Sequence, residues 1–276
     1  MPELPEVEWI ARRLRPALVG RTIEAVTICR ADILAPGGDV DTLAKRTIAK
    51  IGRHGKTLLI GLDDVRPRAS MGLVVRLGMT GQCLLVPRGS ARSPHTHAVV
   101  VFSGEPFELH YRDPRRFGRW RVVESFAEIT TIPDALTLRR RTWRAIVRAH
   151  RGQLRPLLMN QHILAGIGNI YANEILFAAR LHPRRAASRL TPVQRERLYD
   201  AIKSTLHRGI RHGGSTIRDY RTPDGAVGRF QEHFQVYGRA GRPCSRRCGG
   251  SVERLKIRRD AQPGFFCPRC QPLSMR

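Results

Sequence analysis

Eight short runs rich in β-branched and aromatic residues occupy most of the chain between about residue 21 and residue 125. They read RTIEAVTI, TIAKIG, KTLLIGL, GLVVRLGM, QCLLV, HAVVVF, FELHY and GRWRVV, and turn-forming residues separate them. Closely spaced strands without intervening helices favour an antiparallel sandwich or barrel. We expect an antiparallel β-sandwich or barrel here.

Helical patterns flank this β-rich region. Before it, Pro5 suits the first turn of a helix, and apolar residues recur at helical spacing until Pro16, where we expect the helix to stop. After it, the pattern from about 135 to 212 is helical; TPVQ at 191–194 is a capping box, and the Gly-Gly pair at 213–214 ends the last helix. The apolar stripe of that helix consists of Leu198, Ile202, Leu206 and Ile210. The fold class predicted is α+β and multidomain.

The charge of the chain points to an anionic partner. With 49 Lys and Arg against 23 Asp and Glu among 276 residues, the formal charge is +26. Nucleic acid is the leading candidate for such a partner, and an anionic membrane surface is the second. No apolar run approaches the roughly 18 residues that span a bilayer, and the N-terminus is acidic, unlike a signal peptide. We therefore expect a soluble, intracellular protein that does not insert into membranes.

Four of the six cysteines lie near the C-terminus, as CSRRC (244–248) and, after eighteen residues, CPRC (267–270). Two close pairs joined by a β-hairpin can hold one structural Zn²⁺ through Cys244, Cys248, Cys267 and Cys270. The alternative is that these cysteines are free or incidentally paired. Three residues separate the first pair where two are usual, so we expect a wider first knuckle.

The N-terminal stretch MPELPEVE is acidic although the chain is basic. Removal of Met1 would leave Pro2 as a secondary amine, and an α-amine has a pKa near 8, against about 10.4 for lysine. Such an amine is a nucleophile at neutral pH and could attack a sugar C1′. Glu3 and Glu6 could then donate a proton and orient the amine. The alternative is that these acids only favour the start of a helix through its dipole.

Seven motifs in order along the chain resemble one family. They are MPELPEVE, LGMTG (77–81), DPRRFG (113–118), GIGNIYANEILFAARLHP (166–183), GGSTIRDY (213–220), FQVYGR (234–239) and the final CPRCQ. Together they resemble bacterial formamidopyrimidine-DNA glycosylase. The resemblance implies a base-excision-repair glycosylase and AP lyase for oxidised purines, acting as a monomer in the bacterial cytosol on double-stranded DNA that contains oxidised bases or abasic sites.

The resemblance also implies three domains and a set of catalytic residues. The domains would be a catalytic β-sandwich at 1–130, a helix-two-turn-helix domain at 131–228 and a zinc finger at 229–276. Pro2 would hold the sugar as a Schiff base, with Glu3 as proton donor and Glu6 positioning the amine. Lys56 would contact the phosphates around the lesion and assist β-elimination; alone, it could be a solvated lysine at a strand edge.

DNA-contact residues follow from the same resemblance. Met79, Arg115 and Phe117 would fill the space left by the flipped base, with Arg115 facing the orphaned cytosine. The segment from about 215 to 228 would close over the flipped purine. Backbone N–H groups near Asn169 would hold a phosphate at a helix start. Further DNA contacts would come from His95, Arg151 and Arg155.

Two departures from the family pattern qualify these expectations. Arginine stands at 151 and 155, where lysines are common in the family. Gln262 stands where the family usually has an arginine that assists δ-elimination, so Arg258 or Arg259 would have to replace its charge. We therefore expect glycosylase and β-lyase activity more firmly than δ-elimination.

Three alternatives remain open from the sequence. The first is a relative of endonuclease VIII that prefers oxidised pyrimidines. The second is a non-catalytic, zinc-containing protein that binds damaged DNA, and the third is an RNA-binding protein. The acidic tip with Pro2 and Lys56 favours the enzyme.

Overall fold

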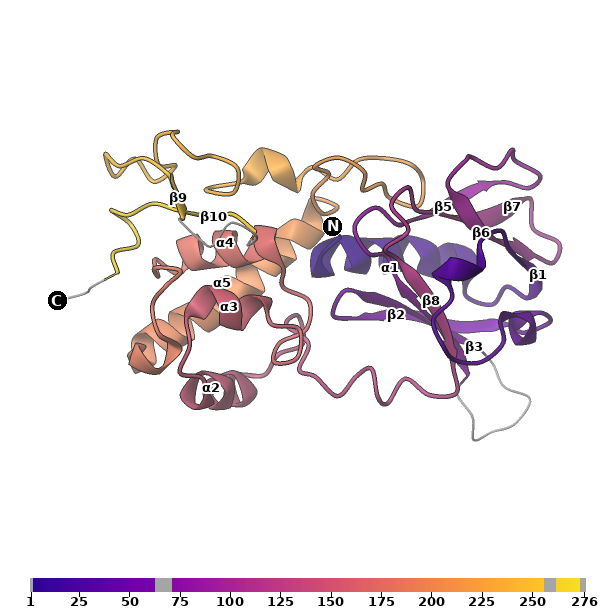
Figure 1. Cartoon of the computed structure of the whole chain (residues 1–276), viewed down its shortest axis with the longest axis horizontal. Helices are drawn as coiled ribbons and strands as arrows, with labels where there is room; N and C mark the ends of the chain where they lie inside the picture. The colour runs from indigo at the N-terminus through magenta and orange to yellow at the C-terminus, as the bar shows by residue number, and fades with distance from the viewer. Residues whose placement is uncertain (1, 63–70, 256–261, 274–276) are drawn as a thin grey trace. The chain divides into compact units, whose positions relative to one another are not determined.

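The computed structural model describes residues 2–62, 71–255 and 262–273. The chain divides into two compact units (Figure 1). Unit 1 comprises residues 1–131 and 210–231, and unit 2 comprises residues 132–209 and 232–276. The three-domain division stays an expectation from the resemblance.

Unit 1 begins with helix α1, Leu4–Leu18. Contrary to our expectation, the helix does not stop at Pro16 but continues through it to Leu18. Pro16 cannot donate to the carbonyl of Arg12 and its ring crowds that carbonyl, but only two helical residues follow it. Continuing the helix buries Leu18 completely beside the other apolar residues of α1, and burying a leucine side chain contributes about 1.5–3 kcal/mol.

Each of the eight predicted runs coincides with one strand to within three residues at either end, and all of these strands pair antiparallel. They form two four-stranded sheets, with orders β1-β6-β7-β5 and β2-β3-β4-β8. The bounds are β1 Ile23–Ile28, β2 Ile48–His54, β3 Thr57–Leu62, β4 Gly72–Arg76, β5 Gln82–Pro87, β6 Thr96–Phe102, β7 Phe107–Arg112 and β8 Arg119–Val123. The prediction of an antiparallel two-sheet domain is confirmed.

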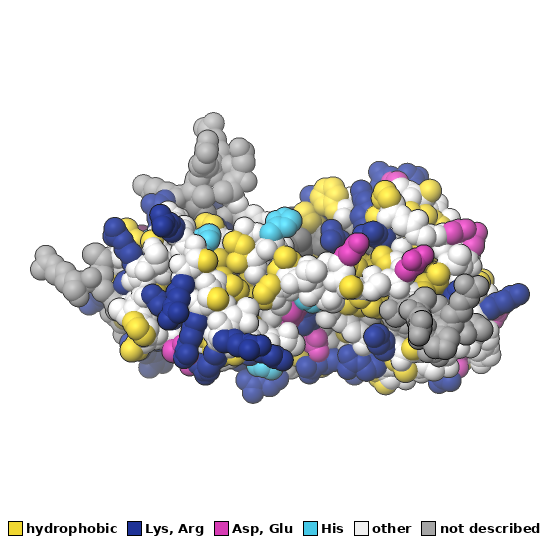
Figure 2. Space-filling model, turned by 90° about the horizontal axis from the view of Figure 1, so that it is seen from below, with side chains coloured by type: hydrophobic (Ala, Val, Ile, Leu, Met, Phe, Trp, Pro, Cys, Tyr) yellow, Lys and Arg dark blue, Asp and Glu magenta, His cyan; other side chains and the backbone are white. Residues whose placement is uncertain are grey.

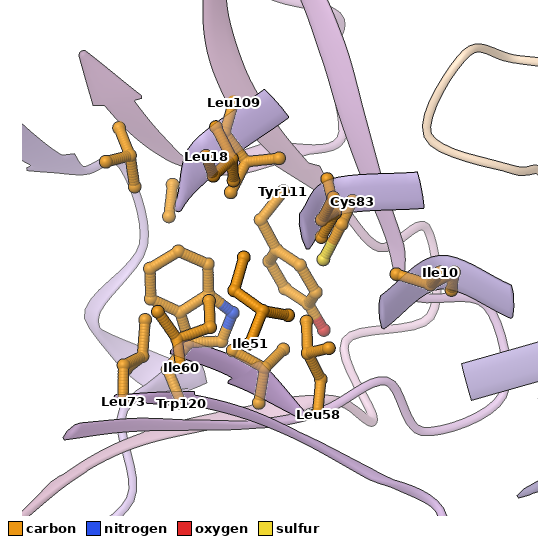
Figure 3. Close-up of a cluster of buried hydrophobic side chains, with 14 of the residues drawn as sticks. Ile10, Leu18, Ile51, Leu58, Ile60, Leu73, Cys83, Leu109, Tyr111 and Trp120 are labelled. Atoms are coloured by element: carbon orange, nitrogen blue, oxygen red, sulfur yellow. The ribbon is translucent and has the colours of Figure 1, made fainter. Parts of the chain in front are cut away.

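The two sheets and α1 share one hydrophobic core (Figure 3). Tyr111 of β7 and Trp120 of β8 bring one large ring from each sheet, with centroids 5.4 Å apart and planes tilted by 58°. Ile10 and Leu18 of α1 enter the same core and are fully buried. Cys83 of β5 also lies in it, and burial raises the pKa of its thiol to about 12. This packing holds α1, and with it the N-terminal residues, against both sheets.

Unit 2 contains the helical region that the sequence predicts. Its helices are α2 Arg140–Ala149, α3 Leu154–Met159 and α4 Asn169–Ala178, and α5 runs from Pro192 to Arg211 across the boundary between the units. The capping box is confirmed: Gln194 N–H donates to Thr191 Oγ1 (3.2 Å), and Thr191 N–H donates to Gln194 Oε1 (3.0 Å).

Across both units, short 3₁₀ helices lie at Ala31–Ile33, Val40–Leu43, Ala187–Arg189 and Phe230–His233.

The cysteine-rich tail packs onto α4 within unit 2. Strands β9, Glu253–Leu255, and β10, Gly264–Phe266, pair antiparallel, as predicted for a hairpin between the cysteine pairs. Phe265 and Val236 share a small core with Phe177 of α4 and with the cysteines. Among the described residues, no helix combines the length and apolar character that crossing a membrane requires.

Candidate active site

The N-terminal tip buries two carboxylates. Glu3 and Glu6 are only 2% and 1% exposed, and Pro2 beside them is buried as well. Buried carboxylates need hydrogen-bond donors. Glu6 Oε2 accepts from the backbone N–H of Glu3 (2.8 Å), while Glu6 Oε1 accepts from the N–H (2.6 Å) and the hydroxyl (3.0 Å) of Ser215. Glu6 therefore ties the chain start to a segment 209 residues away.

Gly214 makes this approach possible. It has φ +76°, and a Cβ there would lie 2.7 Å from Cγ and 2.8 Å from Oε1 of Glu6. The hydroxyl of Tyr220 donates to the carbonyl of Gly213 (3.1 Å), which holds the same segment in place. GGSTIRDY resembles a family motif, but its hydrogen bonds to Glu6 could not be foreseen from the sequence. Only the two glycines, which end α5, hinted at a close backbone approach.

Lys56 lies in the tight turn between β2 and β3, where His54 pairs with Thr57 and Gly55 adopts φ +56°. Burial lowers the pKa of Lys56 below its ordinary value, although the charges of Glu3 and Glu6 act in the opposite direction. The turn therefore brings the lysine into the electrostatic field of Glu3 and Glu6.

A buried ion pair anchors this turn to α1. Arg53 of β2, with a side chain 3% exposed, contacts Glu8 Oε2 (3.1 Å) and donates to the carbonyl of Gly55 (3.0 Å). Burial would raise the pKa of Glu8, but hydrogen bonds and charges from Arg12 and Arg53 outweigh it, and the pKa is lowered. The pair fixes the hairpin that carries Lys56 relative to the helix that carries Glu3 and Glu6.

Two adjacent turns expose Met79, Arg115 and Phe117. Met79 is 38% and Phe117 54% exposed, and the Arg115 guanidinium lies over the Phe117 ring, 4.8 Å from its centroid. The turns touch through their backbones, because a Cβ on Gly78 would lie 2.5 Å from the carbonyl carbon of Phe117. The structure thus brings together the three residues that the resemblance assigns to filling the space left in the duplex by a flipped base.

Asp113 organises these turns from inside. Its fully buried carboxylate accepts from the N–H of Gly118 (2.8 Å) and from the hydroxyl of Thr80, which in turn accepts from the N–H of Arg115 (3.1 Å). Its own N–H donates to the carbonyl of His95 (2.9 Å), whose side chain is exposed. Sequence reasoning did not single out Asp113, although it begins the DPRRFG motif.

In unit 2, Asn169 is the first residue of α4, so its backbone N–H belongs to the first turn of a helix. Arg151 is exposed, whereas Arg155 is 7% exposed and donates from Nη2 to Asn169 Oδ1 (2.6 Å). The side chain of Gln262 is exposed, and its carbonyl oxygen also accepts from Arg155 (2.8 Å). Arg258 and Arg259 lie outside the described residues.

The four C-terminal cysteines form one cluster. Their sulfur atoms all lie within 4.8 Å of one another, with Cys244 and Cys270 at 3.7 Å and Cys248 and Cys267 at 3.6 Å. Ligands in a tetrahedron with Zn–S bonds of about 2.3 Å are roughly 3.8 Å apart. Arg247 has φ +52° and donates its N–H to the Cys244 carbonyl (2.9 Å), which accommodates the extra residue of the wider knuckle. The thiols suit zinc.

Glu174 is a buried acid that the sequence analysis did not single out. Its carboxylate, on α4, accepts from the backbone N–H groups of Gln235, Val236 and Tyr237 at 2.9–3.1 Å. Burial raises the pKa of Glu174, although these hydrogen bonds act in the opposite direction. The residue fastens the chain to α4 just before the cysteine tail.

Comparison with known proteins agrees with this arrangement. The formamidopyrimidine-DNA glycosylase N-terminal domain matches residues 1–120, and the H2TH domain of the same enzymes matches residues 133–221. The proteins named formamidopyrimidine-DNA glycosylase from Herpetosiphon aurantiacus and Heliobacterium modesticaldum are 38% and 40% identical, each over 98% of this chain and 100% of the relative. The chain belongs to the formamidopyrimidine-DNA glycosylase family.

Solved structures similar to this chain include DNA complexes of the Lactococcus lactis Fpg, which is 30% identical. A complex with DNA containing an abasic site has a TM-score of 0.86 over 98% of this chain and 99% of that one. A mutant bound to DNA containing Fapy-dG has a TM-score of 0.87 over 98% and 100%. A third, of the wild-type protein, contains an oxidised pyrimidine, with a TM-score of 0.86 over 98% and 100%.

Proposed function

We propose that this chain is a base-excision-repair DNA glycosylase and AP lyase that removes oxidised purines from double-stranded DNA. The observation that carries the proposal is the buried N-terminal tip, where Glu6 is held by Ser215 and Lys56 approaches both acids. A helix start that served only the fold would not need this convergence of three distant segments. The relatives' names and their DNA complexes support the same reaction.

Pro2 performs the covalent chemistry once Met1 is removed. Its nitrogen attacks C1′, the bond from C1′ to the base breaks, and the base leaves with the bonding electrons and takes up a proton. The C1′–O4′ bond then opens, O4′ takes a proton from Glu3, and an iminium links Pro2 to the sugar. Loss of a proton from C2′ expels the 3′ phosphate, which completes β-elimination.

Glu6 and Lys56 support these steps from fixed positions. Glu6 orients the tip because its carboxylate holds the Glu3 backbone on one side and Ser215 on the other. Lys56 contacts the phosphates around the lesion, and its lowered pKa eases proton exchange during elimination. Both roles depend on burial, which keeps water away from the iminium.

Met79, Arg115 and Phe117 hold the duplex open after the base has flipped. Flipping leaves a gap and an unpaired partner base, which an apolar wedge and a fork of donors can fill. The exposure of Met79 and Phe117 and the stacking of Arg115 on Phe117 suit this role. The segment 215–228 covers the flipped purine, starting from Ser215.

Phosphate contacts anchor the DNA on both units. The amide of Asn169 and the N–H groups at the start of α4 bind one phosphate. His95 and Arg151 are exposed and add contacts. Arg258 or Arg259 would have to supply the charge that Gln262 lacks, so the proposal is firmer for glycosylase and β-lyase activity than for δ-elimination.

One structural Zn²⁺ is held by Cys244, Cys248, Cys267 and Cys270. When bound, it joins the two knuckles and takes no part in catalysis. The protein works as a monomer in the bacterial cytosol. Its functional parts are the sandwich at 1–130, the helical domain at 131–228 and the zinc finger at 229–276.

Borohydride trapping tests the proposal. Protein shown by mass to lack Met1 should form a covalent adduct with a duplex carrying 8-oxoguanine opposite cytosine. The same chain with Met1 retained is the matched control and should form none. If the processed protein gives no adduct on that duplex or on one with an abasic site, the chain is a non-catalytic binder of damaged DNA.

An oxidised pyrimidine is the second candidate substrate. It is favoured by the complex of Lactococcus lactis Fpg with DNA containing an oxidised pyrimidine. Trapping on a duplex with an oxidised pyrimidine, run beside the 8-oxoguanine duplex, separates the two. Faster trapping on the pyrimidine would favour a preference like that of endonuclease VIII.

A further inference from the structure

Arg155 is a buried cation whose contacts lie within unit 2. Its side chain is 7% exposed, and Nη2 lies 2.6 Å from Asn169 Oδ1 and 2.8 Å from the carbonyl oxygen of Gln262. The residue lies on α3, Asn169 begins α4, and Gln262 precedes strand β10. One guanidinium thus joins three separate elements.

These contacts determine which way the Asn169 amide faces. A guanidinium can only donate, so the atom of Asn169 that meets Arg155 must be the oxygen. The side-chain amide of Asn173 also donates to this oxygen (3.1 Å) and to the Asn169 carbonyl (2.6 Å). With Oδ1 held by two donors, Nδ2 is directed away from them, and no described residue accepts a hydrogen bond from it.

The same arrangement holds the start of β10. Asn173 Oδ1 accepts from the N–H of Phe265 (2.8 Å), while Arg155 engages the carbonyl of Gln262. Gly264 leaves room for the guanidinium, because a Cβ there would lie 3.3 Å from Arg155 Nε. The edge of the zinc hairpin and the start of α4 are therefore fastened to one side chain.

We propose that Arg155 is a positioning residue that directs Asn169 Nδ2 toward a DNA phosphate and ties it to the hairpin, without contacting DNA itself. The inference rests on the proposed phosphate contact of Asn169. It assigns to Arg155 a role different from the direct DNA contact expected from the sequence. Its burial is the reason, because a phosphate cannot replace Asn169 and Gln262 as its partners without unpacking both.

A binding experiment separates the two roles without any turnover. The probe is a duplex with a stable abasic-site analogue, and affinity is measured over a series of salt concentrations. Arg155→Met keeps the side-chain volume but removes the donors, and it should weaken binding roughly tenfold. The salt slope should stay unchanged, because a neutral amide contact releases no counterion. A direct phosphate contact would instead lower the slope by about 0.9.

A double-mutant cycle supplies the second readout. Because Arg155 acts through Asn169, Arg155→Met should lower the affinity for the duplex only about twofold when Asn169 has already been changed to alanine. If the affinity losses of the two single variants multiply in the double variant, Arg155 has a merely structural role and the proposal is overturned. A lowered salt slope or an unchanged affinity in Arg155→Met would also overturn it. Arg155→Lys, which keeps a donor, should restore binding to within about threefold. Should the methionine variant fold poorly, Arg155→Gln serves in the same cycle.

The outcome stays distinct from that of the proposed enzyme function. Wild-type protein that shows no preference for the abasic duplex would count against the glycosylase itself. Wild-type protein that binds tightly while Asn169→Ala has no effect would remove the Asn169 contact, and with it this inference, but would leave the glycosylase standing.

Discussion

At Gly214 the backbone passes so close to Glu6 that no side chain fits between them. Gly214 is required for two separate reasons, its left-handed backbone conformation and its close contact with Glu6. Other glycines in unit 1 have the left-handed conformation without that contact. Gly104, in the turn between β6 and β7, has φ +71°, and a Cβ there would meet nothing within 4 Å. Substituting the two glycines in turn therefore separates the effect of backbone strain from the effect of displacing the Glu6 carboxylate.

We predict that Gly214→Ala slows Schiff-base trapping about tenfold or more, because displacing Glu6 moves the tip that carries the amine. Gly104→Ala should trap at the wild-type rate. Both variants should lose about 1–2 kcal/mol of unfolding free energy, since alanine is strained at positive φ. Trapping kinetics and urea unfolding check this. Equal trapping rates in the two variants would show that Glu6 does not depend on Gly214.

At the scale of elements, the β2–β3 hairpin depends on the pair of Arg53 and Glu8. Both side chains are largely buried, 3% and 14% exposed, so removing the charge of Glu8 leaves a cation poorly compensated. We predict that Glu8→Gln lowers the unfolding free energy by about 1–2 kcal/mol at neutral pH. Glu24→Gln is the control, because its pair with Arg88 is exposed and should contribute nothing measurable.

The effect of Glu8→Gln should depend on pH. The pKa of Glu8 is lower in the folded chain than its unfolded value of about 4.3. The stabilisation from ionised Glu8 is therefore complete above the unfolded pKa and is lost as pH falls through the folded pKa. In urea unfolding, the difference in unfolding free energy between Glu8→Gln and the wild type should be smaller at acid pH than at neutral pH. A constant difference would mean that Glu8 acts by packing and not by charge.

At the scale of the whole molecule, positive charge is not confined to one element. On the face seen in Figure 2, Lys and Arg side chains are more frequent than Asp and Glu. A formal charge of +26 makes binding to any duplex strong at low salt and weaker as salt rises. We expect this charge to supply affinity for DNA, whereas selectivity for damage would come from the proposed roles of the N-terminal tip and of Met79, Arg115 and Phe117.

The four-cysteine cluster packs the tail onto α4, because the cysteines share a small core with Phe177 of α4 and Phe265 of β10. We predict that Cys270→Ser lowers bound zinc well below one ion per chain and weakens duplex binding on the order of tenfold. Cys29→Ser, which changes an exposed cysteine outside the cluster, should alter neither. Atomic emission spectrometry measures the zinc bound per chain, and a binding titration measures the affinity for the duplex. Unchanged zinc and affinity in Cys270→Ser would contradict the site.

How far the sequence predicted this protein depends on the range of each interaction. The strands, the capping box at 191–194 and the cysteine cluster follow from residues that are neighbours in sequence or repeat at a short period. The helix end at Pro16 was wrong because the local preference of proline was outweighed by burial of Leu18 in a core built from distant strands. The partners of Asp113 and Glu174 could not be predicted, because no local pattern says which backbone N–H groups a buried acid will meet.

By itself, the sequence determined the eight strands, the starts of α1 and α5, the four thiols and the family resemblance that points to an N-terminal amine. The tertiary structure alone decided that Ser215 holds Glu6 and that Arg155 serves Asn169 and Gln262. These partners are 209 residues apart in the first case, and 14 and 107 in the second. Such pairs form only when packing brings the segments together and buries their polar groups, because burial then makes an unpaired carboxylate or guanidinium too costly.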